Sequence, residues 1–297
     1  MTSPRIALVT AKAARDLDDD LPPLEAALRG KGADVIRAEW DDADAPWETF
    51  DVALLRSTWD YTQRLSEFLD WVTRASALTH LLNPLAVVRW NTDKHYLHDL
   101  AKAGVATVPS VFIEPEHDAR DGVIGFLAQY SNAEFVVKPS VGAGSRDAQR
   151  YNRRQIDAAT QHAQRLLDDR RSVLLQPYFD RVDKHGETAL IFFAGKFSHA
   201  IRKGPLLRSD EAPTRALFAQ EHISARQPTS EEIRLADKTL SAIPFDQPLL
   251  YARVDLIQDP HGAPALLELE LTEPSLFFAF DAGAADRLAE AILRVRR

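Results

Sequence analysis

The chain has 297 residues, of which 45% are hydrophobic and 27% charged, so we expect a folded protein of about two domains. It contains no cysteine, which excludes disulfides, a thiol nucleophile and cysteine metal sites. A net charge of -8 argues against a broad nucleic-acid-binding surface. There is no apolar run that could span a bilayer and no secretory signal, so we expect a cytoplasmic protein without a membrane partner.

Roughly the first eighty residues predict half of a doubly wound α/β unit. Strands are expected at 5–11, 34–40 and 50–57, and helices at 21–33 and 64–79. Prolines open the first helix, and Gly30 and Gly32 close it. The acidic run "DLDDDLPP" before that helix is expected to be a solvated loop that caps it.

The remainder predicts an α+β unit with long antiparallel strands. A helix capped by Asn91 or Thr92 is expected to run to Ala103, where Gly104 ends it. Further strands are expected at 134–140, 172–179, 186–204 (as a hairpin), 249–259 and 263–271. Further helices are expected at 156–170, at 229–243 with a cap at Thr229 or Ser230, and at 284–297.

The last predicted hairpin carries charge on one face. Side chains alternate along a strand, so Arg253 and Asp255 share a face, and so do Glu268 and Glu270 on the partner strand. Three carboxylates on apolar strands repel one another unless something neutralises them, and Mg²⁺ is the natural candidate. The alternative is a solvent-facing sheet with Arg–Glu pairs across the strands.

A lysine precedes a glycine loop in "KPSVGAGSRD". This order does not match the P-loop, in which the lysine follows the glycines at a helix N-terminus. It does not match the dinucleotide-binding fingerprint either, because the glycines are too closely spaced and come late in the chain. Glycines still let a backbone approach phosphates closely, so the loop is a candidate phosphate binder once other residues support it.

Five segments occur in an order that resembles the ATP-grasp ligases: "NTDKHYLHDLAKAGVATVPS", "FVVKPSVGAGSRD", "VLLQPYF", "RVDLI" and "LLELELTEPS". The nearest type is the prokaryotic glutathione synthetase branch. Within it, "RSTWDY" and "GETALIFFAGKFSHAIRKGP" are similar to the ligases that close O-ureidoserine into cycloserine.

The resemblance implies a Rossmann-like α/β N-terminal (pre-ATP-grasp) domain at 1–88 and an α+β ATP-grasp domain with antiparallel sheets at 89–297. Within the second domain, a mobile lid is implied at about 108–180. The implied activity is an ATP- and Mg²⁺-dependent carboxylate–amine ligation, which places the chain in antibiotic biosynthesis. An acyl-phosphate forms on a small amino-acid-like substrate, an amine displaces it, and ADP and phosphate leave. The alternatives are an ATP-binding regulatory protein and a small-molecule phosphotransferase. A homodimer is a further expectation.

The resemblance also implies roles for individual residues. ATP would be bound by Lys94, Lys138, Val141, Gly142, Gly144, Ser145, Gln176, Pro177, Tyr178 and Glu187. Asp255, Glu268 and Glu270 would hold Mg²⁺, as two ions for which Mn²⁺ substitutes. Arg202, Lys203 and Arg253 would face the transferred phosphoryl group. Gln176 and Glu270 depart from the family, in which a carboxylate and an asparagine are common at these positions.

Candidate substrate residues lie at the carboxyl end of a predicted parallel strand, where α/β sheets bind ligands. They are Arg56, Ser57, Thr58 and Tyr61; the alternative is a capped loop with Trp59 packed beneath it. His199 is a candidate for the cleft wall or for structural packing. Ser275, after "TEP", is a candidate substrate contact or a turn residue.

Overall fold

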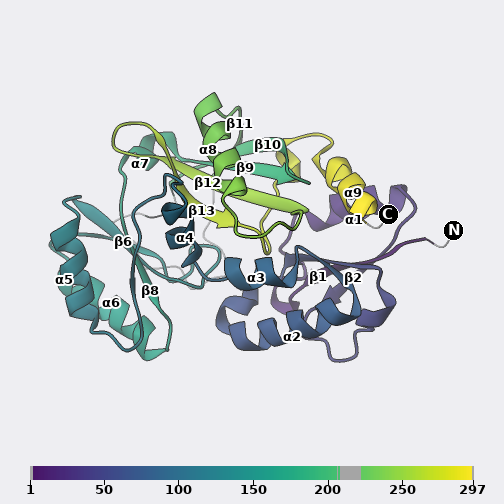
Figure 1. Ribbon diagram of the computed structural model, residues 1–297, viewed down its shortest axis with the longest axis horizontal. Coiled ribbons are helices and arrows are strands. Elements are labelled where there is room, and N and C mark those ends of the chain that lie inside the picture. The colour runs from purple at the N-terminus through teal and green to yellow at the C-terminus, as the bar shows by residue number, and fades with distance from the viewer. Residues whose placement is uncertain (1–2, 206, 208–221, 296–297) are drawn as a thin grey trace.

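The computed structural model describes residues 3–205, 207 and 222–295, so the last two residues of the helix expected at 284–297 lie outside the described part. Three sheets organise the described chain. In Figure 1, the N-terminal unit lies at the lower right, a teal unit lies at the left, and a green and yellow sheet lies above and between them.

The N-terminal unit is a parallel sheet in the order β2-β1-β3-β4, as the alternating strand and helix pattern predicts. Its elements are β1 (Arg5–Thr10), η1 (Lys12–Ala14), α1 (Leu21–Gly30), β2 (Asp34–Glu39), η2 (Trp47–Thr49), β3 (Val52–Ser57), η3 (Trp59–Gln63), α2 (Leu65–Leu78) and β4 (His80–Leu82). α1 and α2 pack on opposite faces of the sheet. A parallel sheet that is covered on both sides needs the continuous apolar strands seen in the sequence.

The sheet at the left of Figure 1 is antiparallel, with the strand order β5-β8-β6-β7. Its elements are β5 (Val111–Ile113), α5 (Ala119–Gln129), β6 (Glu134–Pro139), β7 (Gln149–Asn152), α6 (Ile156–Asp168) and β8 (Val173–Pro177). Both helices pack on this sheet around a core of their own. The sheet lies within the segment 108–180 that was expected to form a lid; the mobility of that segment stays a prediction.

The central sheet is antiparallel, with the order β11-β10-β9-β12-β13. Its elements are α7 (Arg181–His185), β9 (Glu187–Phe193), β10 (Lys196–Lys203), β11 (Ile223–Arg226), α8 (Ser230–Ser241), β12 (Tyr251–Gln258), β13 (Pro264–Glu270) and η4 (Phe278–Phe280). α8 begins with a capping box in which Thr229 and Glu232 bond each other's backbone N–H groups, as expected for this cap.

The chain's last helix returns to the N-terminal unit. α9 (Ala284–Val295) lies beside α1 in Figure 1, and its Leu288 and Ile292 share a core with Leu24 and Leu28 of α1. The same core includes residues of β9 and β10, so it joins the N-terminal unit to the central sheet.

The helix expected from residue 91 to Ala103 is wrong in its boundaries. The chain forms α3 (Leu85–Asn91) and then α4 (Tyr96–Lys102), with a break at "TDKH". Asn91 is no cap: its amide donates to Leu269 O (2.8 Å), and its Oδ1 accepts from Leu271 N (2.7 Å) along β13. β13 is an edge strand with unpaired backbone groups, and Asn91 bonds these groups instead of capping a helix.

α3 links two of the units. Val88 packs in the core of the N-terminal unit, and its neighbour Val87 packs in the core of the central sheet. The domain boundary proposed at residue 88 therefore falls inside a helix rather than in a linker.

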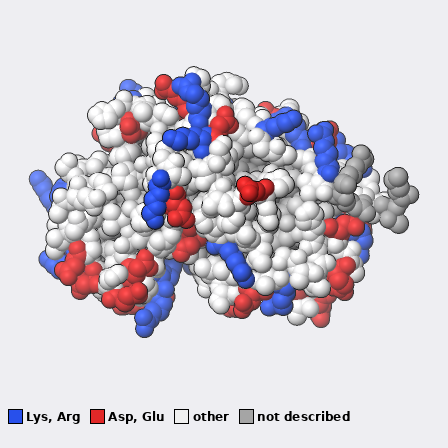
Figure 2. Space-filling model, in the orientation of Figure 1, with Lys and Arg blue, Asp and Glu red and all other residues white. Residues whose placement is uncertain are grey.

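No helix in the described part of the chain is long and apolar enough to cross a membrane. On the described part of the face in Figure 2, basic and acidic side chains are interspersed, without a broad patch of one sign.

Candidate active site

A cavity of about 430 Å³ opens where the three units meet. Of the residues predicted to bind ATP, its walls contain Lys94, Lys138, Gly142, Gly144, Ser145, Gln176, Pro177, Tyr178 and Glu187. Tertiary folding thus brings together residues that lie up to ninety-odd positions apart in the sequence.

Two lysines stand on one side of this cavity. Lys94 follows α3 and donates to the carbonyl oxygen of Gly142 (2.7 Å), and its Nζ lies 3.0 Å from Glu268 Oε1. Lys138 projects from β6 and forms no ion pair with another described residue. Burial lowers the pKa of Lys138 to about 8, although Glu268 favours its charged form. An anion bound beside Lys138 would favour its charged form further.

The glycine loop follows β6 and bends sharply. Gly144 and Ser145 have φ angles of 60° and 57°, in the left-handed region. Val141 does not line the cavity; it packs against the core of the N-terminal unit. The hydrogen bond from Lys94 to Gly142 ties the loop to the helix pair α3 and α4. The backbone of this loop therefore borders the cavity with little side chain in the way.

The connection after β8 forms the opposite side of the cavity. Gln176 donates from Nε2 to Ser110 Oγ (3.0 Å), and the Tyr178 ring lies 3.6 Å beneath the guanidinium of Arg150. Both side chains are therefore held, and the backbone from 176 to 179 borders the cavity.

A buried chain of charges joins β9, β10 and β12. Lys203 forms ion pairs with Glu187 and with Asp255 Oδ2 (2.8 Å). Arg253 donates to both oxygens of Asp255. Burial opposes charge on Asp255, but Arg253 and Lys203 outweigh it and hold the pKa of Asp255 below its usual range. Burial raises the pKa of Glu187 to about 8 despite the attraction of Lys203.

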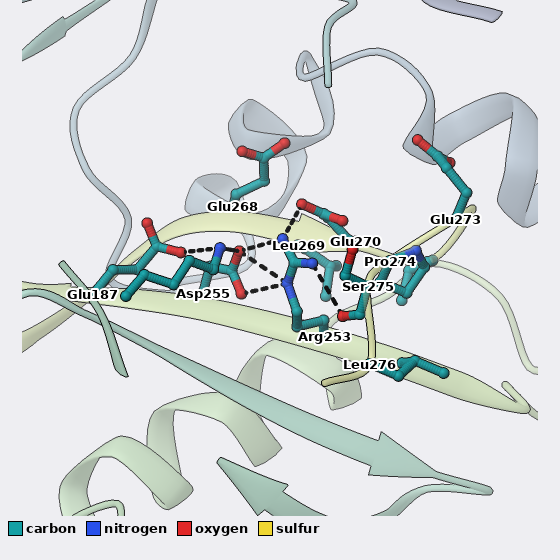
Figure 3. Close-up of polar contacts among 12 residues, drawn as sticks. Glu187, Arg253, Asp255, Glu268, Leu269, Glu270, Glu273, Pro274, Ser275 and Leu276 are labelled. Carbon is teal, nitrogen blue, oxygen red and sulfur yellow. Dashed lines mark hydrogen bonds and ion pairs between the residues drawn. The ribbon is translucent and has the colours of Figure 1, made fainter. Parts of the chain in front are cut away.

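The β12–β13 hairpin carries its charged residues on one face, as predicted. Arg253 pairs with Glu270, and Asp255 pairs with Glu268, across the two strands. Figure 3 shows Glu268 and Glu270 pointing to the same side, with Arg253 between Asp255 and Glu270. The cross-strand Arg–Glu pair of the alternative interpretation does form, but these strands are buried against the cavity rather than facing solvent.

The carboxylates of this hairpin supply the oxygen ligands that Mg²⁺ prefers. Burial raises the pKa of Glu270 to about 7; Arg253 opposes this shift, whereas the charges of Glu268 and Asp255 add to it. Both oxygens of Asp255 are already engaged by cations, and no three acidic or histidine side chains of the described residues converge as a ligand group. The donor types fit a divalent cation at Glu268 and Glu270; the full set with Asp255 stays a prediction.

Arg202 does not reach this site. Its side chain donates to the carbonyl oxygens of His185 (2.7 Å) and Lys184 (3.1 Å), and it does not line the cavity. Neighbouring residues of β10 point to opposite faces, so the strand that brings Lys203 inward turns Arg202 away.

Of the predicted substrate residues, Tyr61 and Ser275 line the cavity, whereas Arg56, Ser57, Thr58 and His199 do not. Arg56 is fully buried and donates to Pro274 O (3.0 Å). Ser57 bonds Thr10 Oγ1 (2.8 Å), and His199 Nε2 donates to Leu276 O (2.8 Å). Arg56 and His199 thus hold the segment after β13, which is the packing role left open for His199.

The sequence interpretation missed several residues of the cavity wall, among them Glu273, Phe277 and Arg146. Glu273 lies beyond the end of β13, so strand alternation from Glu268 and Glu270 gives no information about it. Arg146 directly follows the predicted loop, and its charge was the available signal.

The acidic run before α1 is not solvated as expected. Asp18 and Asp20 are buried, each 3.5 Å from Arg56 Nη2, and neither forms a side-chain cap on α1. Asp20 instead accepts three backbone N–H groups, from Leu276, Phe277 and Phe278.

The family model for the N-terminal domain of D-cycloserine synthetase DcsG matches residues 6–83. The cycloserine biosynthesis protein DcsG of Streptomyces lavendulae is 40% identical over 295 residues, covering 97% of each chain. The chain belongs to the D-cycloserine synthetase family. The crystal structure of D-cycloserine synthetase DcsG superposes with a TM-score of 0.92 over 99% of this chain and all of that one, at 40% identity.

More distant solved structures share the fold. D-alanine–D-alanine ligase from Bacillus anthracis has a TM-score of 0.70 at 16% identity, with 99% of both chains covered. The ATP-grasp ligase PsnB, complexed with a precursor variant, Mg and ADP, has a TM-score of 0.66 at 16% identity over both whole chains. The predicted fold class is confirmed, because the chain shares the fold of these ATP-grasp and D-alanine–D-alanine ligases.

Proposed function

We propose that this enzyme closes the ring of cycloserine by activating the carboxyl group of O-ureidoserine with ATP. The observation that carries the proposal is 40% identity to a cycloserine biosynthesis protein over nearly the whole chain. The cavity supports it, because lysines, a glycine loop and buried carboxylates meet there as phosphoryl transfer requires.

ATP is proposed to lie between the glycine loop and the connection from 176 to 179. Lys94 and Lys138 supply positive charge for its phosphates, and the loop backbone covers them. Glu187 is proposed to lie near the ribose of ATP. Closure of the loop excludes water, which protects a labile acyl-phosphate.

Glu268, Glu270 and Asp255 are the proposed ligands of Mg²⁺, as two ions that Mn²⁺ can replace. When bound, the metal neutralises charge on the phosphate oxygens. Arg253 and Lys203 lie on the same wall and are proposed to stabilise the transferred phosphoryl group. The structure of the related fold with Mg and ADP bound supports this use of metal and nucleotide.

The proposed reaction has three covalent steps. A carboxylate oxygen of the substrate attacks the γ-phosphorus, the bond to the β-phosphate oxygen breaks, and ADP leaves. The nitrogen attached to the side-chain oxygen then attacks the acyl carbon, loses its proton to solvent and expels phosphate, which closes the ring. One water then adds to the carbamoyl carbon, and the bond between that carbon and the ring nitrogen breaks. The nitrogen takes up a proton, and the carbamoyl group leaves as carbamic acid, which decomposes to carbon dioxide and ammonia.

The test measures ADP, phosphate and cycloserine release with Mg²⁺, ATP and O-ureidoserine. We expect all three products from the native enzyme. Lys138→Ala and Glu268→Ala are each expected to lower turnover by at least about 100-fold. The first variant loses positive charge beside the ATP phosphates, and the second loses a proposed Mg²⁺ ligand. Circular dichroism should show an unchanged fold. Full turnover in both variants would overturn the site assignment.

The same experiment separates the two alternatives. A phosphotransferase would give ADP and a phosphorylated product without a ring, which mass spectrometry detects. A regulatory protein would bind ATP and release no ADP. Either result would contradict the ligase proposal.

A further inference from the structure

The segment that follows β13 carries an acidic residue into the cavity. Glu273 lines the wall beyond Glu270, and only 7% of its surface is exposed. In Figure 3, it stands apart from the dashed network that joins Arg253, Asp255 and Glu270.

Other carboxylates of this wall are matched by cations. Glu268 pairs with Lys94, Glu270 with Arg253, and Asp255 with Lys203 and Arg253. No lysine or arginine of the described chain forms an ion pair with Glu273. The hydroxyl of Tyr61, which also lines the cavity, acts on this carboxyl group and lowers its pKa against the effect of burial.

A buried carboxylate without a cation is costly, and here its neighbours increase the cost. Burial and the negative charge of Glu270 together raise the pKa of Glu273 to about 8. A cation that enters the cavity at this point would restore the charged form and form an ion pair shielded from water.

The backbone of this segment is held from several sides. Trp59 Nε1 donates to Glu273 O (3.1 Å), Arg56 Nη1 donates to Pro274 O (3.0 Å), and Arg253 Nη1 donates to Ser275 O (3.2 Å). Since the main chain is anchored, the Glu273 carboxylate is presented to the cavity in a defined position, as a recognition residue requires.

We propose that Glu273, with the hydroxyl of Tyr61, binds the α-ammonium group of the amino-acid-like substrate. The inference rests on the proposed function. A phenolic hydroxyl can both donate and accept, so the Tyr61 oxygen can accept an N–H bond from the same ammonium. An amine held as an ammonium ion has no lone pair, so this contact also prevents the α-amino group from attacking an acyl-phosphate in place of the ring-closing nitrogen.

The experiment compares O-ureidoserine with 3-(ureidooxy)propanoate, which lacks only the α-amino group. Calorimetry measures the binding of each compound to the whole enzyme in the presence of Mg-ADP. We expect the native enzyme to prefer O-ureidoserine by at least about 10-fold, as a charge-assisted hydrogen bond allows. Glu273→Gln should bring this ratio near one while the affinity for the analogue stays the same.

Three further variants sharpen the test. Glu273→Asp keeps the charge and should retain part of the preference, and Tyr61→Phe should lose less than Glu273→Gln. Glu231→Gln makes the same change on the exposed face of α8, where the side chain is 65% exposed, and should retain the native ratio. Unchanged affinity for Mg-ADP shows that each variant is folded.

Two results would overturn the inference alone: an unchanged ratio in Glu273→Gln, or a loss of Mg-ADP affinity in that variant, which would indicate a metal ligand. If the native enzyme binds neither compound, the proposed substrate is wrong, and the inference fails with it.

Discussion

At the scale of single residues, burial changes which groups carry charge. His162 of α6 is buried. Its Nδ1 lies 3.0 Å from the Tyr151 hydroxyl, and its Nε2 has no hydrogen-bond partner among the described residues. Burial lowers the pKa of His162 to about 4, and the charge of Arg165 acts in the same direction. The folded protein therefore holds this imidazole neutral where the unfolded chain would protonate it.

This residue predicts a loss of stability in acid. Between pH 6.5 and 4 the unfolded chain binds a proton at His162 that the folded protein does not, so stability falls as the pH falls. From pH 7 to pH 5 the loss from this group should be roughly 2 kcal/mol. In urea unfolding at the two pH values, His162→Gln should lose less stability than the native protein. The exposed His117→Gln should behave like the native protein; equal pH sensitivity in His162→Gln would contradict the prediction.

At the scale of elements, the β9–β10 hairpin delivers Lys203 and Glu187 to the cavity. It contains two glycines with positive φ, Gly186 before β9 (70°) and Gly195 in the turn (74°). A Cβ on Gly186 would clash with the carbonyl oxygen of Lys203, whereas a Cβ on Gly195 would meet no atom within 4 Å. Both positions have positive φ, but Gly186 also has ψ -169°, in a region that is open almost only to glycine, and it alone has the close approach.

Alanine at these two positions separates strain from packing. Gly195→Ala should cost about 1 kcal/mol, the penalty of a left-handed conformation. Gly186→Ala should cost about 2 to 5 kcal/mol, because overpacking adds to the strain of a conformation that is open almost only to glycine. It should also lower ADP release, since the Lys203 backbone must shift. Chemical denaturation and the ADP assay measure both effects; equal costs at the two glycines would refute the packing argument.

At the scale of the whole molecule, the N-terminal unit completes the site built by the central sheet. Asp20, just before α1, accepts N–H groups of Leu276 (2.6 Å), Phe277 (3.0 Å) and Phe278 (2.9 Å), more than 250 positions along the chain. Together with Arg56, this aspartate holds the segment that carries Glu273 and Ser275.

Removal of that aspartate should affect stability and substrate binding together. Asp20→Ala leaves three backbone N–H groups without their acceptor and should cost about 2 to 5 kcal/mol. The KM for the amino-acid-like substrate should rise more than the KM for ATP, because the loosened segment contributes to the substrate end of the cavity. Thermal unfolding and steady-state kinetics test this. Asp19→Ala, at an exposed neighbour, is the control; a uniform rise in both KM values would argue against local loosening.

The amino-acid sequence by itself determined most of the long strands and helices, the charged face of the β12–β13 hairpin and the resemblance to ATP-grasp ligases. These features depend on local periodicity and on motifs that remain visible in one dimension. Strand alternation placed Arg253, Asp255, Glu268 and Glu270 correctly relative to one another. The same rule assigns Arg202 and Lys203 to opposite faces of β10.

Only the tertiary structure decided which polar side chains face the cavity and which instead bond the backbone of the cavity wall. Arg56 and Asp20 are charged residues near a predicted ligand-binding edge, yet both form hydrogen bonds with backbone groups of the 274–278 segment. No local sequence pattern identifies Glu273. It stands out only in the folded protein, where the neighbouring carboxylates form ion pairs with lysine or arginine and Glu273 forms none among the described residues. Partner assignment among charges depends on distances between units that lie far apart in the chain, and no spacing within one segment contains that information.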